Sequence, residues 1–156
     1  MSFKSPLDEM SKTTPTQFWN DNCSAVDLPF AIEHGAVGAT TNPVIVGQVL
    51  EAELNTYIPK INELISGNPA DTEDDIAWKL NEDMAVAGAK LLEPVFQRTN
   101  GSAGYISIQT NAKYYRDPAR ITEQAIHFKS LAPNIMVKMP ATNAGVKAIE
   151  ESTYQG

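Results

Sequence analysis

Short β-prone segments alternate with longer helical segments along all 156 residues of the chain. Apolar and β-branched runs bounded by polar residues or glycine predict strands, and apolar residues at helical spacing predict helices. The expected strands are 18–21, 36–42, 105–111 and 134–139. The expected helices are 24–34, 44–65, 72–95 (capped by Thr72), 117–131 and 143–154. Strands separated by helices pair in parallel through right-handed crossovers, so this order predicts an α/β fold with a parallel sheet.

Each expected strand carries a polar side chain at or near its C-terminal end. These side chains are Asp21, Asn42, Gln109 with Asn111, and Lys138. Active sites of parallel α/β sheets and barrels lie at the carboxyl edge of the strands. Each residue also has a plain structural interpretation, as a helix cap, a turn residue or a partner of the backbone. Because polar groups inside a barrel need partners, four incidental placements are the weaker interpretation.

Lys138 lies within the apolar run from Asn134 to Thr142, which is a costly place for an ammonium group. Burial lowers the pKa of a lysine, and a neutral amine is a nucleophile towards carbonyl carbons. The placement therefore suggests Schiff-base chemistry. The alternative, favoured when the strand is considered alone, is a lysine at the strand end whose amine extends to water.

Charge and residue usage exclude several classes of function. The net charge of −7 argues against a general nucleic-acid binder, which needs a basic surface. No apolar run approaches the roughly 20 residues of a membrane span, and the N-terminus has no apolar leader. The chain has a single cysteine, Cys23, so it cannot form an internal disulfide, and a reducing, cytosolic setting is the simplest inference. We expect Cys23 to be a small buried core residue. His34 and His127 have no metal-ligand spacing, so no metal site is predicted.

Two motifs resemble those of the transaldolase family, which includes fructose 6-phosphate aldolase-like members. Ala39-Thr-Thr-Asn-Pro43 resembles the family's TTNP motif. Val137-Lys-Met-Pro-Ala-Thr142, followed by Ala144-Gly145, is similar to its Schiff-base lysine strand. Trp19-Asn-Asp21 matches the aspartate of its first strand. The resemblance extends from about Phe18 to Gly156.

The resemblance implies a TIM-barrel transferase of the pentose phosphate pathway that moves a dihydroxyacetone unit between phosphorylated sugars. Lys138 would form the Schiff base with the ketose, and Asp21 would take the proton from the C4 hydroxyl. Asn42, Thr41 and Asn111 would bind substrate. The protonated imine is the electron sink, so the resemblance implies no cofactor and no metal. Thr142 is expected to support the start of the last helix.

Gln109 departs from the family pattern, which places a glutamate there to orient the water used in imine formation. A glutamine holds a water molecule but cannot take its proton. Fructose 6-phosphate aldolases resemble this chain at that position, so simple aldol cleavage is the alternative reaction. The long helical insert between the second and third strands is more like the larger transaldolases.

The chain ends where a fifth strand is expected, whereas a TIM barrel has eight strands and about 250 residues. We expect residues 1–16 to form an arm or short helix, and residues 17–156 to form the N-terminal half of a barrel with four parallel strands. A half barrel has open sheet edges and a bare face, which predicts self-association with a second copy. A third hypothesis is a non-catalytic fragment.

Overall fold

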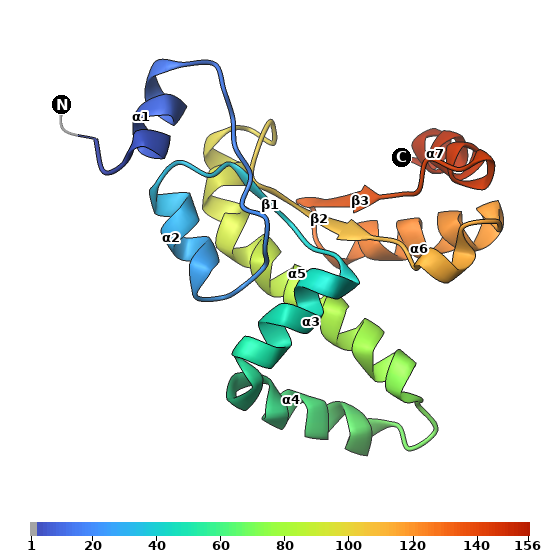
Figure 1. Ribbon diagram of the computed structural model, residues 1–156. Coiled ribbons are helices and arrows are strands. Elements are labelled where there is room, and N and C mark those ends of the chain that lie inside the picture. Colours follow the sequence, from blue (N-terminus) through green and yellow to red (C-terminus); the bar gives the residue numbers. More distant parts are fainter. Residues whose placement is uncertain (1–2) are drawn as a thin grey trace.

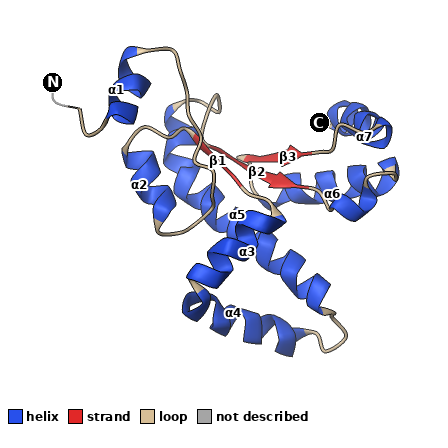
Figure 2. Ribbon diagram, in the orientation of Figure 1, coloured by secondary structure: helices blue, strands red, loops and turns tan. Residues whose placement is uncertain are grey.

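The computed structural model describes residues 3–156, in which α-helices pack against one small parallel sheet (Figures 1 and 2). The strands are β1 (Gly38–Thr40), β2 (Tyr105–Gln109) and β3 (Ile135–Lys138), in the spatial order β1-β2-β3. The helices are α1 (Pro6–Thr13), α2 (Asp27–Glu33), α3 (Pro43–Ala52), α4 (Leu54–Gly67), α5 (Glu73–Arg98), α6 (Pro118–Leu131) and α7 (Asn143–Gln155), with a 3-10 turn η1 (Ala112–Tyr114). The predicted α/β fold with a parallel sheet is confirmed.

One face of the sheet forms the core. Ile106 and Ile108 of β2 and Ile135 of β3 are fully or almost fully buried, and they belong to one apolar cluster with Leu92 of α5 and Phe128 of α6. Side chains alternate between the two faces of a strand. Met136 and Lys138 of β3 therefore point to the opposite face of the sheet, which is open there.

The prediction of four strands is wrong for the first segment. Asn20 makes a single parallel bridge to Ala39, and the sheet proper has three strands. The backbone amide of Asn20 donates to Gly38 and that of Thr40 donates to Asn20. The chain then leaves the sheet, because the side chain of Asn22 binds the following backbone at Ser24.

The single helix expected at 44–65 is also wrong, since α3 and α4 are separate helices that meet at Glu53. The Glu53 backbone, with φ −113° and ψ 24°, lies outside the helical range. Figure 1 shows α3 and α4 projecting away from the sheet beside the first half of α5. The predicted cap at Thr72 is confirmed, because Thr72 and Asp75 bind each other's backbone amides in a capping box.

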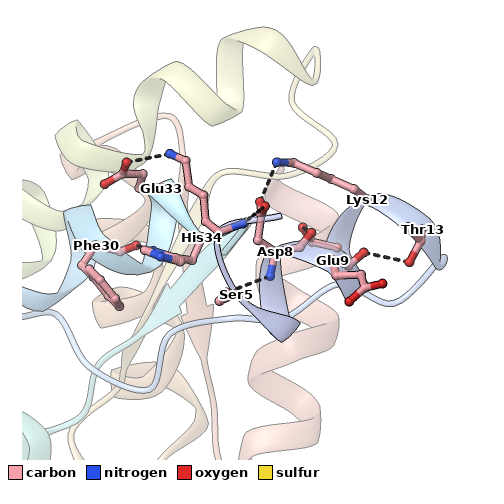
Figure 3. A network of polar contacts seen from close by, with 10 residues as sticks. Ser5, Asp8, Glu9, Lys12, Thr13, Phe30, Glu33 and His34 are labelled. Atoms are coloured by element: carbon pink, nitrogen blue, oxygen red, sulfur yellow. Dashed lines mark hydrogen bonds and ion pairs between the residues drawn. The ribbon is translucent and has the colours of Figure 1, made fainter. Parts of the chain in front are cut away.

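Lys4, just before α1, ties this helix to the end of α2 through an ion pair, and a second ion pair lies within α1 itself (Figure 3). Lys4 Nζ lies 2.6 Å from Glu33 Oε1, and Lys12 Nζ lies 2.6 Å from the buried Asp8 Oδ1. Hydrogen bonds from the Lys12 side chain and the Lys4 backbone hold the pKa of Asp8 below its usual value. Gly35, with φ +98°, is required where this helix approaches, because a Cβ there would lie 2.3 Å from Ser11 Oγ.

Residues 1 and 2 of the predicted arm lie outside the described residues. No helix among residues 3–156 is long and apolar enough to cross a membrane.

Candidate functional site

A pocket of about 170 Å³ lies at the C-terminal ends of β2 and β3. Gln109 and Lys138 are paired residues of these neighbouring strands, so their side chains leave the sheet on the same face. The remaining lining residues come from the loops that follow the two strands: Thr110, Ala112, Tyr115, Met139 and Pro140. Among residues 3–156, no carboxylate lines this pocket, although the protein carries a net charge of −7.

Lys138 is the last residue of β3, and its side chain is exposed. This exposed setting is the one favoured when the strand is considered alone, and the buried setting that suggested Schiff-base chemistry is wrong. The reason is the alternation of β3, in which Ile135 faces the core while Met136 and Lys138 face outwards. Within residues 3–156, Lys138 has no ion pair, so its amine is available to a ligand in the pocket.

Asp21 is exposed and lies next to β1, at the opposite edge of the sheet from β3. Its Oδ1 accepts a 2.6 Å hydrogen bond from the hydroxyl of Thr40, the last residue of β1. Neighbouring strands are ~4.8 Å apart, and β1 and β2 lie between the Asp21 segment and β3. Asp21 is not among the residues that line the pocket of Lys138, so the structure does not bring this pair together there.

Asn42 and Thr41 have structural contacts. Asn42 is the N-cap of α3, where its Oδ1 accepts from the backbone amides of Val44 (2.9 Å) and Ile45 (3.1 Å). This leaves its Nδ2 group to donate to a ligand. Thr41 is 1% exposed, its amide donates to the Ser107 carbonyl, and its hydroxyl has no hydrogen-bonding oxygen or nitrogen partner in the described structure.

Asn111 shapes the loop after β2 and does not line the pocket. Its Oδ1 accepts from the Lys113 amide at 2.9 Å and caps η1, and its own amide donates to Gln124 Oε1 at 2.6 Å. The side chain is buried. Of the two polar residues predicted on this strand, Gln109 is therefore the one that faces the pocket with Lys138.

The sequence did not predict Tyr115 as a pocket residue, and it predicted only the helix-capping role of Thr142. Tyr115 lines the pocket, and its carbonyl accepts a 2.8 Å bond from the Thr142 hydroxyl. Thr142 is the N-cap of α7, as predicted, through its bond to the Gly145 amide. No sequence signal marks Tyr115, because the contact joins two loops that are far apart along the chain.

Cys23 is buried as expected, and burial raises the pKa of its thiol. Across residues 3–156, no three His, Cys, Asp or Glu side chains come close enough together to hold a metal ion.

The fold and the site define an α/β protein with polar side chains gathered at the carboxyl edge of a parallel sheet. Comparison with known proteins gives this class a family. The transaldolase/fructose-6-phosphate aldolase family matches residues 18–156, and the chain belongs to this family. The expected resemblance is thus confirmed.

Individual relatives agree with the family assignment. A transaldolase of Mycobacterium bovis is 32% identical over 122 residues, which cover 77% of this chain and 32% of the relative. A transaldolase of Thermobifida fusca is 29% identical over 167 residues, which cover 97% of this chain and 42% of the relative. The chain spans less than half the length of these curated relatives.

Proposed function

We propose that the chain carries the Schiff-base lysine of a transaldolase-type transferase and that this lysine is Lys138. The observation that carries the proposal is the pairing of Lys138 with Gln109 in a pocket at the carboxyl edge of the sheet, without a competing carboxylate. The proposed substrates are phosphorylated sugars, the proposed location is the cytoplasm, and no cofactor takes part.

The proposed reaction begins at the substrate carbonyl. Lys138 Nζ bonds to the carbonyl carbon of a ketose phosphate, and the carbonyl oxygen leaves as water to give the protonated imine. Asp21 takes the proton of the C4 hydroxyl, and the C3–C4 bond breaks. The electron pair of that bond moves into the imine. An aldehyde leaves, and a three-carbon enamine stays on Lys138. Asn42 Nδ2, Thr41 and Asn111 are proposed to contact substrate or to shape its binding site.

The fate of the enamine separates two candidate functions. In transfer, the enamine attacks an acceptor aldose, Asp21 returns its proton, and hydrolysis frees the product. In aldol cleavage, the enamine takes a proton from solvent, and hydrolysis frees dihydroxyacetone. Gln109 supports the second reaction as a candidate, because fructose 6-phosphate aldolases resemble this chain at that position.

Borohydride trapping tests the proposal. The chain is incubated with fructose 6-phosphate, reduced and digested, and we expect a three-carbon adduct on the peptide that contains Lys138. The control is Lys138→Ala, which should yield no adduct. Absence of an adduct on the wild-type chain would remove both enzymatic functions and leave the non-catalytic fragment. Faster turnover with erythrose 4-phosphate supports transfer, and indifference to it supports cleavage.

We also infer that residues 17–156 are the N-terminal half of a (β/α)8 barrel preceded by an arm, 1–16, and that the open face of the sheet associates with a second copy. Met136 on that face is 47% exposed, which supports the inference. Light scattering should give twice the chain mass of 17.0 kDa, and a monomer at high concentration would contradict self-association.

A further inference from the structure

The segment Asn20–Ser24, called here the aspartate loop, is held in one shape by its own side chains. Asn20 Nδ2 donates to the carbonyl and to Oδ1 of Asn22, at 3.0 and 2.9 Å. The Asn22 Oδ1 also accepts from the Ser24 amide at 3.1 Å. These bonds close a turn around Asp21, which stays exposed.

One long-range side-chain hydrogen bond ties the C-terminal end of the aspartate loop to a distant helix. Ser24 is 3% exposed, and its hydroxyl donates to Glu53 Oε1 at 2.6 Å across 29 residues of sequence. The same Ser24 oxygen accepts from the amides of Val26 and Asp27 before α2. Hydrogen bonds to a charged acceptor are stronger than neutral ones, so the bond to Glu53 is the strongest of the three that the Ser24 hydroxyl makes.

Glu53 lies at the junction of α3 and α4, and α3 begins at Pro43 after its N-cap, Asn42. The carboxylate therefore connects the aspartate loop to the helix that Asn42 caps. Its charge also acts on the buried Cys23 and the half-buried Tyr57. Burial first, and then the Glu53 charge, raise the pKa of Cys23 and of Tyr57.

We propose that Glu53 is a positioning residue, which acts through Ser24 to hold Asp21 at the carboxyl edge of the sheet without touching substrate. The role in turnover depends on the function proposed above, in which Asp21 moves the proton. The mechanical part, that Glu53 holds the aspartate loop, stands on the Ser24 contact alone.

Cys23 offers a direct probe of the loop, because it is the sole cysteine, is 3% exposed and lies between Asn22 and Ser24. Its rate of alkylation by iodoacetamide reports how often the loop opens. We expect Glu53→Ala to raise this rate about tenfold, which corresponds to the loss of about one hydrogen bond. Glu53→Gln keeps an acceptor for Ser24 and should restore a rate within a few-fold of wild type.

Glu51→Ala is the matched control, since Glu51 is an exposed carboxylate two residues away on α3. Rates are compared over a pH series, because removal of the Glu53 charge also makes the thiol easier to ionise. A rate increase at the pH plateau, where all thiol is ionised, reports opening alone. Equal plateau rates for Glu53→Ala and wild type, with all variants folded by circular dichroism, would overturn the proposal.

Turnover gives the second readout. We expect Glu53→Ala to lower kcat several-fold with KM unchanged and to leave the total adduct on Lys138, six-carbon plus three-carbon, intact after borohydride reduction, because Glu53 acts on proton transfer and not on imine formation. A loss of adduct together with kcat would contradict this positioning role. If no variant forms an adduct, the proposed function fails, while the alkylation rates still decide whether Glu53 holds the loop.

Discussion

The two edges of the sheet, called here the lysine side and the aspartate side, hold their polar residues in different ways. On the lysine side, β2 and β3 with the loops after them, regular pairing aligns Gln109 with Lys138. On the aspartate side, residues 18–24 with β1 and the start of α3, one bridge and a set of side-chain bonds hold Asp21. The lysine side therefore depends on the core beneath it, and the aspartate side depends on individual polar contacts.

The largest expected effect comes from the core under the lysine side. Ile108 is fully buried and pairs with Val137 of β3. Ile108→Ala should lower the free energy of unfolding by about 2–5 kcal/mol, measured by urea denaturation. Val44→Ala, at a 69% exposed position, is the control and should change it by less than about 0.5 kcal/mol. Similar values for the two variants would contradict the assigned core.

Helix caps allow the two sides to be compared directly. Asn42 caps α3 on the aspartate side, and Thr142 caps α7 on the lysine side. Each substitution by alanine should cost about 1 kcal/mol in thermal or urea unfolding. Thr142→Ala should cost more than Asn42→Ala, because Thr142 also binds the Tyr115 carbonyl. The reverse order would show that the loop contact adds no stability.

A smaller effect is expected for the bond between Thr40 and Asp21. Thr40→Val keeps the side-chain shape and removes the donor to Asp21 Oδ1. Because the contact is solvent-exposed, unfolding free energy should fall by less than about 1 kcal/mol. Turnover should fall while the total Lys138 adduct, six-carbon plus three-carbon, forms as before, if Asp21 serves proton transfer. A loss of the adduct would place Thr40 in imine formation instead.

The smallest effect concerns α1 and pH. Hydrogen bonding to Lys12 lowers the pKa of Asp8, and hydrogen bonding to Lys4 lowers the pKa of Glu33. A lowered pKa gives stability that is present above the unfolded-state value, near 4, and is lost as pH falls through the folded-state value. Below about pH 4, the protection of α1 amides against hydrogen exchange, corrected for the intrinsic exchange rate, should therefore fall before that of the sheet. Asp8→Asn should remove much of this pH dependence, and an unchanged profile would contradict it.

Sequence patterns predicted the alternating order of strands and helices, the caps at Thr72 and Thr142, and the pairing of polar residues with strand ends. These features are local, so turn residues and apolar periodicity carry them. The break at Glu53 was missed, because it accompanies a contact with Ser24, which is distant in sequence. The exposure of Lys138 agrees with the interpretation favoured for the strand alone, and the buried setting proved wrong because an apolar run does not reveal which face of a strand is covered.

Borohydride reduction followed by peptide mass spectrometry tests the central claim, that Lys138 on the lysine side is the reactive amine. The account predicts one three-carbon adduct, on the Lys138 peptide of the wild-type chain, which disappears in Lys138→Ala. In Asp21→Asn, where C3–C4 cleavage is slowed, a six-carbon adduct should accumulate on Lys138 in place of the three-carbon fragment. An adduct on another lysine, such as Lys147, with Lys138 unmodified would contradict the account.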